Sequence, residues 1–209
     1  MSSSLIALAQ SLGLAYASGV SVYATILLVG LCERAHWIDP LPGVMGVAAS
    51  PVVLIVCGAL TILEVGASLI PGVASVWETI HTAIRPPAAA LLAVATTWHA
   101  DPSITAVAAI LGGGIGLATH ATKLGLRVAV DTSPEPFSNG ILTATEFSVV
   151  AALSYFIWSH PIISLALALG LLVLTAMLVR IVWRTIGRVF SDILSGRWMS
   201  TADPGTTNV

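Results

Sequence analysis

The chain has 209 residues, of which 56% are hydrophobic and only 9% are charged. Ordinary soluble domains carry roughly a quarter charged residues, so this composition excludes a water-soluble globule and predicts a protein that has lipid as its solvent. The net charge of -2 comes with eight scattered Lys and Arg residues. Because a nucleic-acid backbone is bound by clustered cations, we exclude nucleic acid as a partner.

Six apolar stretches approach the length of about 20 helical residues that crosses the hydrocarbon core of a bilayer. In chain order they are approximately Leu5–Leu31, Pro51–Ile70, Pro86–Trp98, Ser103–Val130, Ile141–Trp158 and Ile162–Val182. The third is short for a span. We therefore predict an all-α fold, a polytopic membrane helix bundle with about six transmembrane helices. Residues 1–198 form its single membrane domain, and the small polar residues 199–209 form a disordered tail.

The distribution of cations predicts the orientation, because Lys and Arg accumulate at the cytoplasmic ends of spans. With six spans and an inner N-terminus, only Arg34 falls outside, and seven cations fall at or near cytoplasmic ends: Arg85, Lys123, Arg127, Arg180, Arg184, Arg188 and Arg197. No cation precedes the first apolar run, which also exceeds the length of a signal peptide, so we expect it to be retained. We expect a multi-pass protein of the cell inner (cytoplasmic) membrane with both termini cytoplasmic.

The first predicted span places small side chains at mid-membrane: Gly13, Ser18, Gly19 and Ser21. Small residues allow neighbouring helices to approach closely, and close packing is the default interpretation. The alternative is a broken helix whose backbone is exposed to a substrate, which membrane proteins tolerate where the backbone lines a cavity.

Between the second and third stretches, the sequence predicts an amphipathic helix. Its two faces carry Val73, Val76, Trp77, Ile80 and Ile84 on one side and Glu78, His81 and Arg85 on the other. The helix either lies on the inner membrane surface or is re-entrant. A Glu and a His at this spacing can share a metal, but no further ligands are identifiable, so we favour a solvated polar face and expect no metal and no cofactor.

The two halves of the chain share short fragments, which suggests repeats over residues 5–98 and 103–185. Leu60–Glu64 resembles Leu142–Glu146, and Gly13–Ala15 resembles Gly116–Ala118. A duplicated unit of three spans gives a 3+3 inverted repeat, as in many secondary transporters.

Glu64 and Glu146 are the most informative residues because each lies within an apolar stretch. Placing a charged residue near the centre of a membrane helix costs roughly 2.5 to 3.5 kcal/mol, so a function or a partner must offset it. Thr61 shares a helical face with Glu64, and Thr143 shares one with Glu146. We favour a binding function for the two carboxyls over a structural hydrogen bond or ion pair.

The fourth stretch carries three basic groups on or near one helical face, together with two glycines: Gly112, Gly116, His120, Lys123 and Arg127. The glycines permit close helix approach, and the basic groups can neutralise the glutamates or bind an anionic substrate or head group. For Arg127 alone we favour snorkelling to the interface. For His120 and Lys123 the two interpretations stand equal.

Five motifs carry a resemblance to a known family, and they cover nearly the whole chain: Glu64 with Ile70–Val73, Arg85-Pro86, Thr119–Arg127, Ser133–Asn139 and Glu146. The chain resembles a bacterial family of small multi-span integral membrane proteins that is catalogued only as a domain of unknown function. The resemblance implies a shared fold and a polar site drawn from these motifs, Asn139 included. Acidic residues that the family tends to have are replaced here by Ala74 and Phe147.

The leading functional hypothesis is a small secondary transporter or permease for an ion or a small or anionic solute, working as a homodimer. Its binding residues are Glu64, Glu146, Lys123, Arg127 and His120, and its secondary candidates are Glu78, His81, Arg85, Thr61, Thr143 and Asn139. The alternative is a membrane scaffold or accessory subunit in which the same charges form a structural network. A third hypothesis is an enzyme acting on lipid head groups with His81 or His120 as its base, which no complete catalytic constellation supports.

Overall fold

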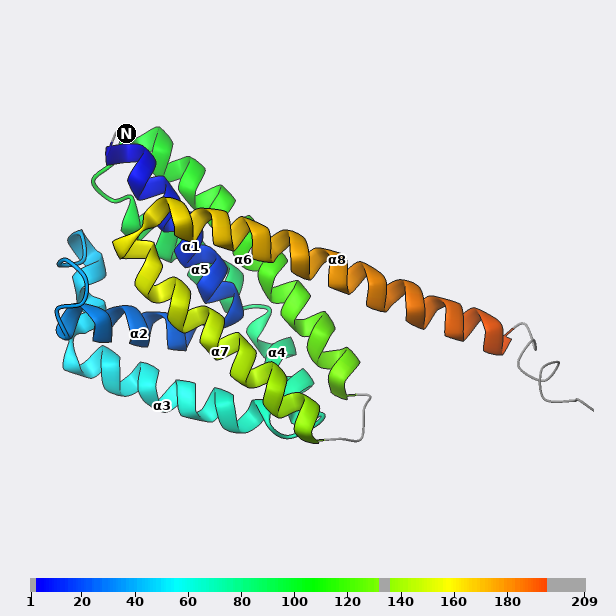
Figure 1. Ribbon diagram of the computed structural model, residues 1–209. Coiled ribbons are helices and arrows are strands. Elements are labelled where there is room, and N and C mark those ends of the chain that lie inside the picture. Colours follow the sequence, from blue (N-terminus) through cyan, green and yellow to red (C-terminus); the bar gives the residue numbers. More distant parts are fainter. Residues whose placement is uncertain (1–2, 132–135, 195–209) are drawn as a thin grey trace, which may run out of the picture.

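The computed structural model describes residues 3–131 and 136–194, which form a bundle of helices without strands in those ranges (Figure 1). The elements are α1 (Ser3–Val20), α2 (Val22–Arg34), the 3-10 helix η1 (Gly43–Ala49), α3 (Pro51–Ser68), α4 (Val73–His81), α5 (Arg85–Thr96), α6 (Pro102–Asp131), α7 (Pro136–Ser159) and α8 (Pro161–Leu194). The predicted all-α helix bundle is confirmed. The tail predicted at 199–209 lies outside the described residues.

Four helices in the described part of the chain are long and apolar enough to cross a membrane: α1, α3, α6 and α7. The apolar start of α8, Pro161–Leu174, is shorter. Helix α5 has 12 residues, which at 1.5 Å per residue span about 18 Å of a hydrocarbon core about 30 Å thick. The protein is therefore a membrane-embedded helical bundle, the described residues of which include four helices of full membrane-crossing length, and the count of six crossings stays a prediction.

The first predicted span, Leu5–Leu31, is wrong as a single helix. The chain is extended at Ser21, with φ -154° and ψ 109°, and α2 leaves in a different direction from α1 (Figure 1). The break has a local cause, because the Ser21 hydroxyl caps α2 by accepting a hydrogen bond from the backbone N of Ala24 at 3.3 Å. The helix break of the alternative interpretation is present, and the exposure of its backbone to a substrate stays a prediction.

Helix α1 is the centre of the bundle and contacts α5, α6, α7 and α8. Its residues from Gly13 onward are all buried, and small side chains make this possible. A Cβ atom added to Gly19 would lie 2.8 Å from the carbonyl oxygen of Gly116 on α6, and one added to Gly112 would lie 2.6 Å from the Cβ of Ala93 on α5. The predicted close packing of small residues is present alongside the helix break.

Candidate functional site

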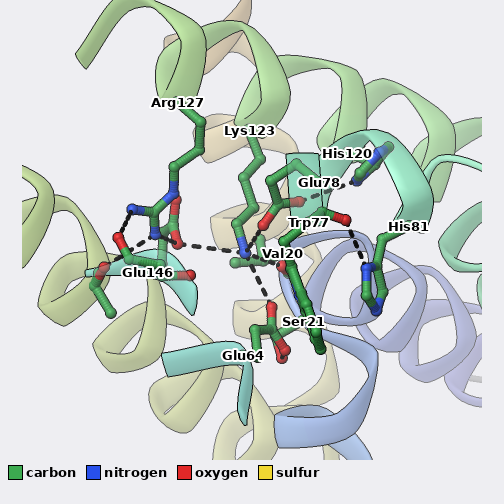
Figure 2. A network of polar contacts seen from close by, with 12 residues as sticks. Val20, Ser21, Glu64, Trp77, Glu78, His81, His120, Lys123, Arg127 and Glu146 are labelled. Atoms are coloured by element: carbon green, nitrogen blue, oxygen red, sulfur yellow. Dashed lines mark hydrogen bonds and ion pairs between the residues drawn. The ribbon is translucent and has the colours of Figure 1, made fainter. Parts of the chain in front are cut away.

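Six ionisable side chains from five helices meet inside the bundle, and Figure 2 labels all of them except Arg85. We call them the charge cluster, and it consists of Glu64 on α3, Glu78 on α4, Arg85 on α5, Lys123 and Arg127 on α6, and Glu146 on α7. None of these side chains is more than 9% exposed. With all six ionised, three positive and three negative charges balance, which is the condition under which buried charges can be accommodated.

Lys123 lies at the centre of the cluster, between three carboxylates (Figure 2). Its Nζ is 2.9 Å from Oε1 of Glu78, 3.1 Å from Oε1 of Glu64 and 3.4 Å from Oε2 of Glu146. It also donates a hydrogen bond of 2.8 Å to the carbonyl oxygen of Val20, which the break between α1 and α2 leaves available. Glu146 is thus the most distant of the three carboxylates around the ammonium group.

Arg85 links two carboxylates and determines the tautomer of His120. Its guanidinium donates to Oε1 of Glu64 at 2.6 Å and forms a close ion pair with Glu78. Its Nη1 also lies 3.2 Å from Nδ1 of His120. Because a guanidinium can only donate, this Nδ1 accepts and carries no proton, and Nε2 of the neutral ring donates to the Thr82 hydroxyl at 2.9 Å.

Arg127 is fully buried, so the snorkelling interpretation is wrong for this residue. Its guanidinium donates to Oε2 of Glu146 at 2.5 Å and to the Thr143 hydroxyl at 3.1 Å. It also donates to Oδ1 of Asn139 at 3.4 Å and to the Ser68 carbonyl at 3.1 Å. These partners replace the water that a snorkelling side chain would seek, and they place two of the secondary candidates, Thr143 and Asn139, beside the cluster.

The amphipathic helix α4 is oriented opposite to the favoured prediction. Its polar residues Glu78 and His81 are buried, as is Arg85 after it, whereas Val76 and Ile80 on its apolar face are exposed. The prediction of a solvated polar face is therefore wrong. The polar face turns inward because Glu78 finds Arg85 and Lys123 there, and the apolar face turns outward.

Side chains of α4 make hydrogen bonds to α2 and α6, and these contacts were not predicted from the sequence. Nδ1 of His81 donates to the Trp77 carbonyl at 2.7 Å, and its Nε2 lies 3.1 Å from the hydroxyl of Tyr23 on α2. At the other end, the Ser75 backbone N and hydroxyl donate to Asp131 of α6 at 3.2 and 2.5 Å. Since both nitrogens of His81 have protein partners, as do those of His120, neither ring is placed as a free base.

The structure places one predicted site residue, Thr61, outside the cluster, and it places Ser21 beside Glu64. Thr61 does not join the cluster, because its hydroxyl donates to the carbonyl of Cys57 one turn earlier at 2.7 Å. Ser21, which the sequence indicated only as a small residue, donates to Oε2 of Glu64 at 2.6 Å. Its hydroxyl therefore serves both the carboxylate and the start of α2.

A pocket of about 300 Å³ reaches the cluster from one side, between α1, α6, α7 and α8. Its walls present almost entirely apolar surface, from residues that include Val20, Leu126, Leu142, Val149, Leu171 and Leu174. Lys123 and Glu146 are its charged lining residues. In Figure 1, α8 crosses α1 and α6 and then extends away from the bundle. The pocket thus joins an apolar space to one carboxylate and the central ammonium group.

Two buried oxygen atoms among the residues that line this pocket lack a hydrogen-bond partner: Oε1 of Glu146 and Oγ1 of Thr119. Glu64 and Glu78 do not line it. The carboxylates of Glu64 and Glu78 are consequently paired and closed off from the pocket, whereas Glu146 has an oxygen without a partner on the side where it lines the pocket; Nε of Arg85 and Nε of Arg127, which do not line it, also lack a partner.

The fold and the cluster define a class of protein: a membrane-embedded helical bundle with a buried, charge-balanced polar centre. The family model described as "Domain of unknown function (DUF4126)" matches residues 8–181, and the chain therefore belongs to that family. The resemblance inferred from the motifs is confirmed in this respect. No curated protein and no solved structure matched the chain.

Proposed function

We propose that this protein is a small secondary transporter or permease for an ion or a small anionic solute, and that the charge cluster holds the substrate or the coupling ion. The proposal places it in the cell inner membrane with both termini in the cytoplasm. The orientation now depends on fewer cations than expected, because Arg85, Lys123 and Arg127 are buried in ion pairs.

The observation that carries this proposal is the pocket that ends on Lys123 and Glu146. A carboxylate that exchanges a ligand must be reachable. Glu146 meets this condition better than Glu64, since it lines the pocket and its contact with Lys123 is the longest of the three, at 3.4 Å.

The break between α1 and α2 gives independent support. Irregular backbone at membrane depth is tolerated where it is buried in protein or lines a cavity, and it is frequent at the binding sites of transporters. Here the Val20 carbonyl at the break binds Lys123, and Val20 also lines the pocket. The broken helix therefore contributes directly to the centre that we assign to the substrate or the coupling ion.

The test is uptake of labelled sodium, chloride, phosphate and lactate by proteoliposomes, one probe at a time. We expect saturable uptake of at least one probe, abolished by Glu146→Gln and retained in the matched control Asp39→Asn, which removes an exposed carboxylate outside the cluster. Uptake of all four probes no faster than in protein-free vesicles, or uptake at the wild-type rate in Glu146→Gln, would contradict the proposal.

A second candidate function, a scaffold or accessory subunit, is favoured by the complete burial of Glu64 and Arg85 within a closed ion-pair network. For a scaffold, Glu146→Gln should affect stability and partner binding only. A pull-down from the native membrane that recovers one dominant protein, together with the absence of uptake above, would support the scaffold over the transporter.

A further inference from the structure

Two unpaired oxygen atoms in the lining of the pocket define the hydrogen-bonding groups that a bound ligand needs. Oε1 of Glu146 accepts no hydrogen bond, and Oγ1 of Thr119 has no partner. Oε1 itself is buried, whereas the Glu146 side chain as a whole is 9% exposed, and a ligand therefore reaches Oε1 by a rotation about the soft terminal torsion. The three protons of Lys123 are already directed to Val20, Glu64 and Glu78. A ligand that donates one hydrogen bond to Glu146 and exchanges another with the Thr119 hydroxyl, which can donate or accept, would satisfy both oxygens.

The charge balance of the cluster limits the charge of the ligand. The groups that face Glu146 are Arg127 and Lys123 of α6, with Glu64 of α3 and Glu78 of α4 beyond Lys123 and Tyr16 of α1 beside the pocket. The charges of the six ionised groups in the charge cluster sum to zero. A head group that stays charged would leave an uncompensated charge next to a buried network, which is strongly unfavourable. The bound head group is therefore neutral.

We propose that the pocket binds a monocarboxylate with a small apolar body together with one proton. The substrate anion and the proton enter as the neutral acid, so the net charge of the site is unchanged and no covalent bond forms or breaks. The acid O–H donates to Oε1 of Glu146, its carbonyl oxygen accepts from Thr119, and its apolar body lies against Leu142, Val149 and Leu171. This inference deepens the proposed transport function and rests on it for the movement of the substrate.

The experiment is isothermal titration calorimetry of the full chain in detergent with four six-carbon probes: hexanoate, hexanamide, hexanesulfonate and hexylammonium. We expect hexanoate to bind with uptake of one proton, and its affinity to fall about tenfold per pH unit above the acid's own pKa of about 4 to 5. Hexanamide, which is neutral and offers the same donor and acceptor, should bind independently of pH. The permanently charged sulfonate and the ammonium should bind at least about tenfold more weakly than hexanoate.

Two variants locate the binding. Val149→Trp fills the pocket and should abolish hexanoate binding, whereas the matched control Val52→Trp, at a position 71% exposed on α3, should leave it unchanged. Thr119→Val, which keeps the shape of the side chain, should weaken hexanoate binding about tenfold. Elution of each variant as a single peak on size exclusion separates lost binding from lost folding.

The proposal is overturned if hexanesulfonate binds as well as hexanoate, if hexylammonium is preferred, if hexanoate binding takes up no proton, or if folded Val149→Trp binds like the wild type. These outcomes are separable from those of the uptake test. Hexanoate binding without uptake of any probe supports the carboxylate site and contradicts transport. Uptake of sodium or phosphate without hexanoate binding supports transport and contradicts the carboxylate site.

Discussion

Replacing Glu64 by Gln should destabilise the protein strongly, because it removes one charge from a buried and balanced set. The Glu64 side chain is completely buried, pairs with Arg85 at 2.6 Å and with Lys123 at 3.1 Å, and accepts a hydrogen bond from Ser21 at 2.6 Å. Its loss leaves a net charge of +1 in the bundle. Removing one partner of a buried ion pair costs about 3 to 5 kcal/mol, which for a chain of this length lowers the unfolding temperature by about 6 to 20 °C.

A compensating second change distinguishes charge balance from simple loss of contacts. Lys123→Met alone should also destabilise, because it leaves a net charge of -1. The double variant Glu64→Gln/Lys123→Met keeps the pairs of Arg85 with Glu78 and of Arg127 with Glu146, and it restores neutrality. Its loss of stability should therefore be smaller than the sum of the two single losses, by about 1 to 3 kcal/mol.

The assay is reversible unfolding in detergent, followed by circular dichroism, for the wild type, both single variants, the double variant and the exposed control Asp39→Asn. We expect Asp39→Asn to behave like the wild type. Strict additivity of the two single losses, or a Glu64→Gln variant as stable as Asp39→Asn, would refute the assignment of a balanced cluster.

Two further predictions concern the ends and contacts of α6. Gly112→Ala should lower stability by about 1 to 3 kcal/mol through overpacking against Ala93, whereas Gly114→Ala, whose added Cβ meets nothing within 4 Å, should raise it by up to about 1 kcal/mol in the same unfolding assay. Equal effects would contradict the close α5–α6 contact. Hydrogen bonds from the side chain and backbone of Ser103 hold the pKa of the Asp101 carboxyl below its usual value. The Asp101 carboxylate therefore stabilises the start of α6 at pH values above its unfolded pKa, and this stabilisation is lost as the pH falls through its folded pKa. Ser103→Ala should raise the Asp101 pKa measured by NMR titration, and an unchanged pKa would contradict the contribution of these hydrogen bonds.

The sequence predicted the residues of the cluster better than their surroundings. Glu64 and Glu146 are conspicuous as carboxyls within apolar runs, and helical spacing places His120, Lys123 and Arg127 on one face of α6. Because such charges need partners, their meeting follows from composition. Their exact pairing depends on how helices distant in sequence are placed, which periodicity does not encode.

The orientation of α4 shows why the remainder was not predictable. Periodicity shows that Glu78, His81 and Arg85 share a face, but it does not show whether that face meets water or protein. A count of charges within or beside apolar segments would have favoured protein, since the three cations Arg85, Lys123 and Arg127 need one carboxylate more than the two glutamates in the spans supply. The break at Ser21 lacks a proline, and its signal, a hydroxyl that can cap α2, is shared by many serines inside helices. The proposed inverted repeat stays a prediction.

The most direct test of the central claim is to map carboxyl accessibility in the membrane with a small apolar carbodiimide, which modifies carboxyls that it reaches from an apolar space. We expect mass spectrometry to find modified Glu146, which lines the pocket, and unmodified Glu64 and Glu78, which do not line it. Modification of Glu64 or Glu78 to the same extent as Glu146, or a Glu146 that stays unmodified, would contradict the claim that the charge cluster meets its ligand at Glu146.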